Sequence, residues 1–192
     1  MFILGVLAAL SLVGWVALLM HPARPWDMRP VAEDEPAAAS PAEWPPIAVV
    51  VPARNEAETL PDTLPSLLAQ DYPGPLRVIV VDDRSVDGTA DAARGAVAPA
   101  EARTVTVVTV DELPAGWAGK VWAMQRGLDA AGVLGEDGAD APRRVLLTDA
   151  DIRHAPQSLR LLVAESERDG LALDSRMALL SCASPAGKWL MP

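Results

Sequence analysis

The sequence is poor in cysteine, because Cys182 is the single thiol in 192 residues. One cysteine excludes an internal disulfide framework, and it excludes a zinc site built from cysteines. No histidine lies near Cys182 in the sequence, so a small apolar residue within a strand is the favoured interpretation over a nucleophile. The chain is therefore expected to work without thiol chemistry.

Positive charge is also scarce. Lysine and arginine together number 16 against 26 aspartates and glutamates, which gives a net charge of −10, and the sequence pI is about 4.6. A general nucleic-acid binder presents a basic face to the phosphate backbone, so this balance argues against nucleic acid as a partner. A single anionic nucleotide can still bind where a metal ion and a few local cations bridge the negative charges.

The glycine-rich turn of dinucleotide-binding proteins is missing as well. The β-branched run Ile47-Ala-Val-Val-Val51 predicts a buried strand, and Pro52-Ala-Arg-Asn-Glu56 follows it. A dinucleotide site needs a Gly-x-Gly-x-x-Gly turn at this point, so that the backbone can approach the pyrophosphate. The sequence therefore argues against a dinucleotide-dependent oxidoreductase.

Charged residues are absent from the amino-terminal segment between Phe2 and Met20, which is almost wholly apolar. Its length is close to the roughly 20 residues that cross a membrane. A cleaved signal peptide would carry basic residues before this run and a small-x-small site after it, and neither is clear here. Residues 1–21 are therefore predicted to form an uncleaved transmembrane anchor. Arg24 and Arg29 follow it, which predicts a single span of the cytoplasmic (inner) membrane with the rest of the chain in the cytoplasm.

The composition changes after the anchor to proline, alanine and acidic residues. Residues 22–46 show neither a helical nor a strand period, so they are expected to form an extended linker. The remaining residues, 47–192, are predicted to form one globular domain. The chain is long enough for such a domain plus a short appendage, since 51% of its residues are hydrophobic.

The globular part alternates strand and helix patterns. Helices are predicted from Leu60, over Ala90–Ala96, over Lys120–Ala131 with Val121, Met124 and Leu128 on one face, and from Pro156. Strands are predicted at Ile47–Val51, Arg77–Val81, Thr104–Val110, Arg144–Thr148 and Met177–Cys182. This alternation predicts an α/β fold, with a mostly parallel sheet and helices on both faces.

Acidic residues follow two of the predicted strands. Asp82 and Asp83 come directly after one strand, and Asp149 and Asp151 come after another. Because parallel strands end at the same edge of a sheet, these carboxylates are expected at its ligand-binding edge. Carboxylates gathered in this way repel one another unless a cation lies between them. A divalent metal that holds a phosphate-bearing substrate is the predicted cation.

Four motifs in order resemble the family 2 glycosyltransferases, which have the GT-A fold. They are Pro52-Ala-Arg-Asn-Glu56, Asp82-Asp-Arg-Ser-Val-Asp-Gly-Thr89, Gly119-Lys120 before a helix, and Asp149-Ala-Asp151. Each motif alone is weak, but four in register are specific. The resemblance covers about Ile47 to Cys182. The variant Trp117-Ala-Gly-Lys-Val-Trp-Ala123 and the amino-terminal anchor are most similar to the hopene-associated, membrane-bound branch of that family.

The resemblance implies a role for each motif. It implies nucleotide-sugar contacts at Pro52, Ala53, Arg54, Glu56, Asp83, Lys120 and Asp149. It places the metal on Asp151, with Asp149 beside it at the ribose or at a metal-bound water. Hard oxygen ligands favour Mg²⁺ or Mn²⁺. A carboxylate at Asp83 can accept a hydrogen bond from a uracil N–H, which would favour a UDP-sugar.

Simpler structural roles are expected for several neighbouring residues. Asp82 is expected to fix its loop, Asp87 to cap the following helix, and Gly88 to allow a tight turn. His154 is either a metal neighbour or a polar residue at a helix entry, and the second interpretation is favoured. Trp117 and Trp122 either stack on the base or sugar or pack under the loop, and the sequence does not decide between these.

The expected function is inverting, metal-dependent transfer of a hexose from a nucleotide sugar to a membrane lipid, with a hopanoid as one acceptor. A polyprenyl-phosphate or ceramide-type sugar transferase shares the same donor motifs. No residue matches the general base by position, so the base is expected beyond this chain, together with the rest of the acceptor half. A non-catalytic, membrane-anchored nucleotide-sugar-binding module is the alternative from another class.

Overall fold

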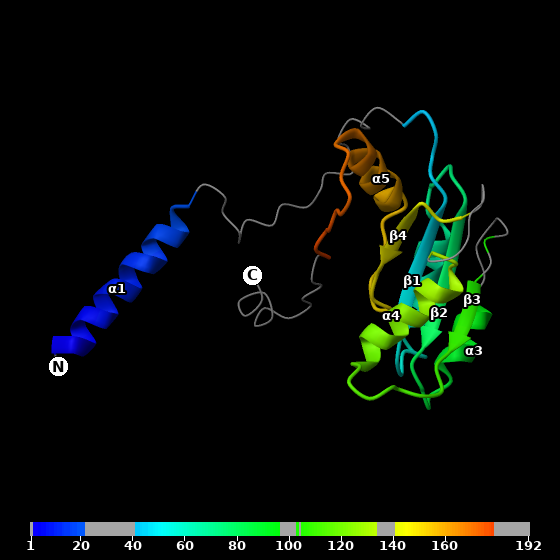
Figure 1. The fold of residues 1–192 in the computed structure, drawn as a ribbon, viewed down its shortest axis with the longest axis horizontal. Coiled ribbons are helices and arrows are strands. Elements are labelled where there is room, and N and C mark those ends of the chain that lie inside the picture. The colour runs from blue at the N-terminus through cyan, green and yellow to red at the C-terminus, as the bar shows by residue number, and fades with distance from the viewer. Residues whose placement is uncertain (1, 22–40, 97–102, 104, 134–140, 179–192) are drawn as a thin grey trace. The chain divides into compact units, whose positions relative to one another are not determined.

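A computed structural model describes residues 2–21, 41–96, 103, 105–133 and 141–178 (Figure 1). The chain divides into two compact units, one of which spans Asp34–Arg176 and contains the sheet. The helices and strands in chain order are α1 Phe2–Leu19, β1 Ile47–Ala53, α2 Leu60–Leu68, β2 Leu76–Asp82, α3 Thr89–Gly95, β3 Val105–Thr109, α4 Gly119–Ala130, β4 Arg144–Leu147 and α5 Ser158–Arg168.

Helix α1 forms the described part of the other unit. It has 18 residues, none of them charged in its first or last turn. Its large apolar side chains are exposed, as at Leu10 and Val13. Within the described stretches, no helix reaches the combined length and apolarity that crossing a membrane requires.

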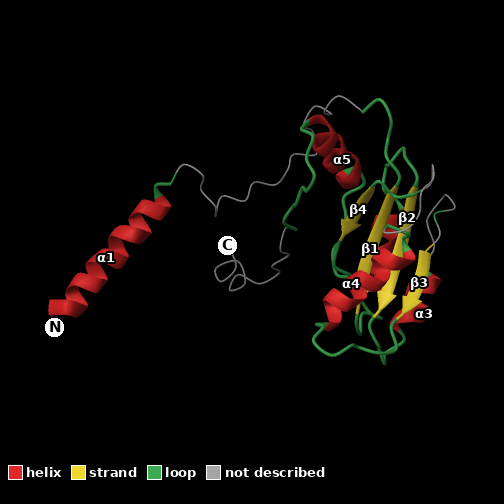
Figure 2. Cartoon of the chain, in the orientation of Figure 1, coloured by secondary structure: helices red, strands yellow, loops and turns green. Residues whose placement is uncertain are grey.

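Four parallel strands form the sheet, in the order β3-β2-β1-β4 (Figure 2). The chain moves outward from β1 through β2 to β3 and then returns to place β4 on the other side of β1. This reversal makes the crevice between β1 and β4 a topological switch point, where open α/β sheets bind their ligands. The parallel sheet predicted from the sequence is therefore confirmed.

The central strand β1 is buried on both faces. Val49 and Val51 point into a core formed with α2, α3 and α5, while Ala48 and Val50 point into a core formed with α4. Successive side chains of a strand alternate between its faces, so a continuous apolar run is what a strand covered twice requires. Helices on both faces of the sheet are thus confirmed.

Helix α4 packs through a face that shares only Leu128 with the apolar stripe predicted from the sequence. Val121 is 52% exposed, whereas Ala123 and Gly127 are the buried residues of the helix. A Cβ atom placed on Gly127 would lie 2.3 Å from Cγ1 of Val50, so the backbone of α4 sits directly on the sheet. Small residues, rather than the larger apolar ones, mark the packed face because they permit this close approach.

The ordered fold begins before the predicted boundary at Ile47. The ring of Trp44 meets that of Tyr72 edge to face, with 5.4 Å between centroids. The Tyr72 hydroxyl donates a hydrogen bond of 2.6 Å to the carbonyl of Pro45, and the carbonyl of Pro46 accepts from the N–H of Arg143. The predicted linker therefore ends in a packed segment. Its residues 22–40, and residues 179–182 of the predicted fifth strand, lie outside the described residues, and Met177 and Ala178 are not in a strand.

Candidate functional site

The loops after β1, β2 and β4 meet at the carboxyl edge of the sheet. Asp82 is the last residue of β2, and it lies opposite Ala53, the last residue of β1. Asp149 and Asp151 follow β4, which pairs with the other side of β1. The four aspartates therefore share one edge, as the sequence predicts, but the width of β1 separates them into two pairs.

Asp83 is a buried carboxylate held by arginines. Only 4% of the residue is exposed. Its Oδ1 accepts from Nε of Arg84 at 3.0 Å, and its Oδ2 lies 3.7 Å from the guanidinium of Arg54. The amino terminus of α4 also approaches it closely, because a Cβ on Gly119 would lie 2.5 Å from Oδ2. Protein cations therefore already offset this charge.

Side-chain hydrogen bonds join the loops after β1 and β2. The N–H of Asn55 donates to the Ser85 hydroxyl at 2.9 Å. In the other direction, the N–H of Val86 donates to the side-chain oxygen of Asn55 at 3.1 Å. Asn55 and Arg84 both have a φ of 57°, a left-handed conformation that is uncommon outside glycine. These bonds offset the cost of that conformation and fix the two arginines beside Asp83.

Asp87 extends the same network. Its carboxylate accepts from the N–H of Thr89, the first residue of α3, and from the N–H of Ala57. The Thr89 hydroxyl also donates to this carboxylate. That bond is the largest cause, and the N–H bonds add to it, in holding the pKa of Asp87 below its ordinary value. The predicted cap is confirmed with one shift: Gly88, with φ of 90°, is the N-cap residue, and Asp87 precedes it.

Lys120 and Asp149 form an ion pair across the switch point. The Nζ of Lys120, in the first turn of α4, lies 2.6 Å from Oδ1 of Asp149. Both side chains are about half exposed, and Asp151 is exposed as well. The structure thus brings together three residues that the sequence assigned to a phosphate and metal site.

The other predicted contacts occupy more buried positions. Pro52 and Ala53 lie within β1 and are buried, and the carbonyl of Ala53 accepts from the N–H of Asp83. Glu56 is half-buried, and its N–H donates to the Thr89 hydroxyl. Asp82 is buried and caps the N–H of Ser85 at 3.0 Å, the loop-fixing role expected of it.

The two tryptophans of the α4 segment pack against each other. Their ring centroids are 5.0 Å apart with an interplanar angle of 63°. Trp122 also packs against the core beneath α4, whereas Trp117 is 40% exposed. The structure favours packing for Trp122, and it leaves the face of Trp117 partly open to solvent.

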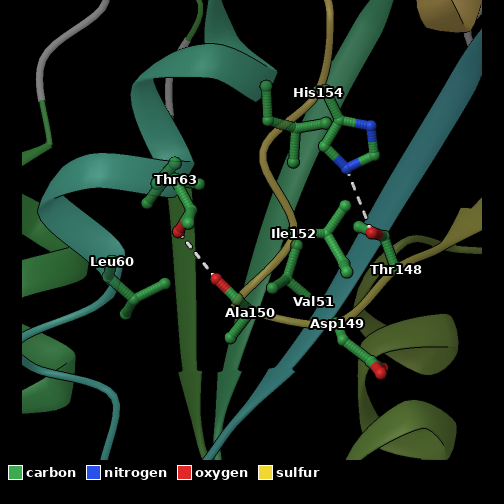
Figure 3. Close-up of a pocket in the computed structure, with 10 residues that line it drawn as sticks. Val51, Leu60, Thr63, Thr148, Asp149, Ala150, Ile152 and His154 are labelled. Carbon is green, nitrogen blue, oxygen red and sulfur yellow. Dashed lines mark hydrogen bonds between the residues drawn. The ribbon is translucent and has the colours of Figure 1, made fainter. Parts of the chain in front are cut away.

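Helix α2 and the turn directly after it hold the loop after β4 through three polar side chains. The Thr63 hydroxyl donates to the carbonyl of Ala150 at 2.6 Å. The Ser66 hydroxyl accepts from the N–H of His154 at 3.0 Å, and Gln70 donates to the carbonyl of Ala155 at 2.8 Å. A small pocket lies between α2 and this loop (Figure 3). Its volume of about 10 Å³ is close to that of one water molecule, so it is no sugar site.

His154 closes one side of this pocket. Its Nε2 shares a hydrogen bond of 3.1 Å with the Thr148 hydroxyl (Figure 3), and burial lowers its pKa from the ordinary value. Among the described residues, no group of three or more histidine, cysteine or acidic side chains is arranged to hold a metal ion. The hydrogen bonds of the His154 ring to Thr148 and of its N–H to Ser66 favour the helix-entry interpretation over the metal-neighbour one.

The chemistry of the donor set suits a metal shared with a substrate. Asp149 and Asp151 offer hard carboxylate oxygens from exposed positions. Mg²⁺ and Mn²⁺ sites of this kind use one or two carboxylates, and substrate phosphates and water complete the shell. The residues present therefore fit such an ion together with a diphosphate, and they do not form a closed protein cage.

Sequence reasoning missed Arg84 and the polar face of α2. Arg84 lies at the variable position of the Asp82-Asp-x-Ser motif, so the family resemblance assigns no role to Arg84. Thr63, Ser66 and Gln70 recur at helical spacing between buried leucines. Buried polar side chains need partners, and that spacing is the signal that would have predicted a polar contact for α2.

Comparison with known proteins agrees with this geometry. Residues 48–180 match the family described as glycosyl transferase family 2. An N-acetylglucosaminyltransferase of Mesorhizobium japonicum is 43% identical over 64 residues, which are 33% of this chain and 14% of that protein.

Two solved structures are similar to this chain, and the first of them shows the same fold. The mannosyltransferase PcManGT of Pyrobaculum calidifontis, in complex with GDP-Man and Mn²⁺, is 29% identical with a TM-score of 0.58, over 83% of this chain and 42% of that one. S. aureus TarS is 23% identical with a TM-score of 0.46, over 65% of this chain and 20% of that one. The chain thus spans less than half the length of each of these proteins.

Proposed function

This chain belongs to glycosyl transferase family 2, and on that premise we propose that it binds a nucleotide sugar, specifically a UDP-sugar, and takes part in metal-dependent hexose transfer. The observation that carries this proposal is the ion pair between Lys120 and Asp149 at the switch point. It places a cation from a helix amino terminus beside the exposed carboxylates of the Asp149-Ala-Asp151 loop. An anionic diphosphate bound there would meet both the lysine and a divalent ion.

Each loop has a distinct part in this function. Lys120 and the amino-terminal N–H groups of α4 favour a negative group at the switch point. Arg54, whose side chain is 60% exposed, is available to contact the same diphosphate. Asp151 and Asp149 would hold Mg²⁺ or Mn²⁺, which supplies Lewis-acid neutralisation of the charge that develops on the leaving diphosphate.

We assign recognition of the nucleotide base to Asp83, whose carboxylate is already paired with an arginine. Its carboxylate is 5% exposed and paired with Arg84 at 3.0 Å. To accept a uracil N–H it must exchange part of an arginine contact for the base. The guanidinium so released would remain next to the nucleotide, where it can offset phosphate charge.

Titration of the full chain with UDP-, GDP- and dTDP-glucose, with and without Mn²⁺, tests the donor site. We expect the tightest binding for the UDP-sugar, and loss of the Mn²⁺-dependent part in Asp151→Ala with an unchanged circular dichroism spectrum. Arg168→Ala, whose ion pairs are on the surface of α5, is the matched control. Equal UDP-sugar affinity in Mn²⁺ and in EDTA would contradict the metal role.

A membrane lipid acceptor is the second part of the proposal, and a hopanoid is the specific acceptor we propose. Its support is the sequence resemblance together with the uncharged apolar run from Phe2 to Met20, although α1 by itself does not reach the length and apolarity of a span. This run would anchor the chain in the cytoplasmic membrane as a single amino-terminal span, with the sheet domain on the cytoplasmic side. Insertion of a charge into such a segment is costly. Leu10→Asp together with Val13→Asp should therefore release the chain from membranes during alkaline extraction, and release of the native chain would contradict the anchor.

Product assays separate the acceptor classes. Because no residue of this chain matches the general base, the chain alone should transfer poorly when membranes are supplied with the donor and with a hopanoid, a polyprenyl phosphate or a ceramide. The product that does form should be a glycosylated hopanoid. Transfer to either of the other lipids would replace that acceptor assignment. Donor binding without transfer to any of them would support the binding-module alternative.

A further inference from the structure

The loop that carries the two exposed carboxylates is tied to helix α2 rather than to the sheet alone. β4 ends at Leu147, and three side chains hydrogen-bond to the backbone of the loop: Thr63 and Ser66 of α2, and Gln70, which lies two residues after the helix ends at Leu68. Thr63 and Gln70 are buried, at 8% and 3% exposed. We call these three residues the α2 polar face.

The contact of Thr63 is with the centre of the Asp149-Ala-Asp151 sequence. Its hydroxyl donates to the carbonyl of Ala150 at 2.6 Å, and the contact is buried. Figure 3 shows this bond on one side of the loop, with the Asp149 side chain directed away from Thr63. The hydroxyl therefore holds the backbone from behind and does not contact the Asp149 carboxylate.

Peptide geometry links this bond to the metal carboxylate. The carbonyl of Ala150 lies in one rigid plane with the N–H and Cα of Asp151, because the peptide bond does not rotate freely. Fixing the direction of that carbonyl fixes the position of the Asp151 Cα, so the carboxylate of Asp151 can move only by rotation about its own N–Cα and side-chain bonds. Thr63 thus restricts where Asp151 can place its carboxylate, without touching any ligand.

The rest of the α2 polar face fixes the far end of the loop. The Ser66 hydroxyl accepts from the N–H of His154 at 3.0 Å and donates to the carbonyl of Thr63 at 2.6 Å. Gln70 donates to the carbonyl of Ala155 and accepts from the N–H of Leu159 at 3.0 Å, the second residue of α5. Both ends of the segment 150–159 are therefore anchored to α2 and the turn directly after it.

We propose that Thr63 is a positioning residue that sets divalent-metal affinity by orienting Asp151 through the Ala150 carbonyl, with Ser66 as its support. This inference rests on the proposed function, since it takes Asp151 as a metal ligand. Groups that orient metal ligands from behind contribute strongly to affinity, and their loss costs about 10-fold to 100-fold in metal binding.

The test is a Mn²⁺ titration of the full chain in the presence of saturating UDP, followed by the electron paramagnetic resonance signal of free Mn²⁺. Thr63→Val keeps the shape of the side chain but removes the donor, and it should weaken Mn²⁺ binding about 10-fold. Thr63→Ser keeps the hydroxyl and should restore binding to near the native value. UDP affinity measured in EDTA should stay unchanged in both variants, which a general loss of structure would not allow.

Ser66→Ala provides a second variant should Thr63→Val fail to fold, and the same weakening of Mn²⁺ binding is expected. Its matched control is Ser166→Ala on α5, which removes a buried serine hydroxyl that donates to the carbonyl of Leu171 at 3.3 Å, away from the loop. Native Mn²⁺ affinity in a folded Thr63→Val or Ser66→Ala variant would overturn the positioning role alone. Absence of Mn²⁺ binding by the native chain would overturn the proposed function and this inference together.

Discussion

Lys120 and Asp149 lie 2.6 Å apart, although 29 positions of sequence separate them (149 − 120). One begins a helix on one face of the sheet, and the other follows the strand across the switch point. A cation at the first turn of a helix is unfavourable toward the helix dipole, so Lys120 gains from an anionic neighbour. In the chain without ligand, that neighbour is the carboxylate assigned to the metal site.

The first prediction follows from this competition. A divalent ion that binds Asp149 must share the carboxylate with the Lys120 ammonium. Lys120→Met should therefore raise the affinity for Mn²⁺ when no nucleotide is present. It should lower the affinity for UDP when Mn²⁺ is present. Its effect on the free energy of unfolding should be below about 1 kcal/mol, because the pair is half exposed. Calorimetric titrations with Mn²⁺ alone, and with UDP plus Mn²⁺, measure the two effects.

Arg94→Met is the control for that experiment. Arg94 forms an ion pair of 2.9 Å with Asp91 on the exposed side of α3, outside the candidate site. Both titrations should be unchanged in it. Parallel changes in Mn²⁺ and UDP affinity in Lys120→Met would contradict the competition.

The architecture could be predicted from the sequence because β1 and β2 are covered on both sides. A strand of this kind must be apolar at every position, and Ile47–Val51 and Val78–Val81 display that requirement directly. The boundaries were less accurate: β1 continues through Pro52 to Ala53, since a parallel partner and the buried edge extend the strand beyond its β-branched residues.

The packing of α4 could not be predicted from apolar periodicity. Val121, Met124 and Leu128 form an apolar stripe, but of these only Leu128 packs against the core, and the helix contacts the sheet most closely at Ala123 and Gly127. Close approach between a helix and a sheet favours the smallest side chains, which contribute little to a hydrophobic pattern. Trp44 was likewise assigned to the linker because prolines surround it, although its ring is part of the fold.

The candidate site was also predicted only in part from the sequence. The pattern of strands identified which carboxylates lie at the ligand edge, and the parallel sheet confirms their common edge. It could not identify which cations pair with them, because Arg84 on Asp83 and Lys120 on Asp149 depend on loop conformation and on how α4 sits on the sheet. The contacts of the α2 polar face are also non-local, joining positions more than 80 residues apart.

The second prediction concerns the contact between Gly119 and Asp83. Gly119→Ala would place a Cβ 2.5 Å from Asp83 Oδ2, and the arginines prevent the carboxylate from moving aside freely. The amino terminus of α4 should shift away from the nucleotide edge, so UDP affinity should fall by about 10-fold or more if one charged hydrogen bond is lost.

Gly127→Ala gives the comparison. Its Cβ would meet Val50 at 2.3 Å and Val81 at 3.0 Å within the core, and overpacking of this kind costs about 1–3 kcal/mol of unfolding free energy. Urea denaturation should therefore show the larger loss of stability for Gly127→Ala, while UDP binding measured by calorimetry should show the larger loss of affinity for Gly119→Ala. The reverse ranking would contradict the role given to Gly119.

The third prediction concerns where the fold begins. Deletion of residues 1–40 should leave a chain that unfolds cooperatively, because the packed segment starts after them. Deletion of residues 1–46 also removes the Trp44 ring and the Pro45 and Pro46 carbonyls that accept from Tyr72 and Arg143. The aromatic pair alone contributes about 0.5–1.5 kcal/mol. Thermal unfolding should show a clearly lower midpoint for the longer deletion. Equal midpoints would mean that Trp44 belongs to the linker and does not stabilise the fold.

The last prediction follows the protonation of His154. Burial lowers its pKa below the ordinary value of 6.5, so the unfolded chain binds a proton at a higher pH than the folded one does. The free energy of unfolding should therefore be highest above pH 6.5 and fall as the pH drops through and below that value.

Replacement by glutamine removes this proton while keeping a polar group near Thr148. Urea denaturation between about pH 7.5 and pH 5 should show a smaller loss of stability in His154→Gln than in the native chain. The comparison isolates the histidine, because the other groups that titrate are the same in both chains. An identical pH dependence would mean that the imidazole is as accessible to protons in the folded chain as in the unfolded one.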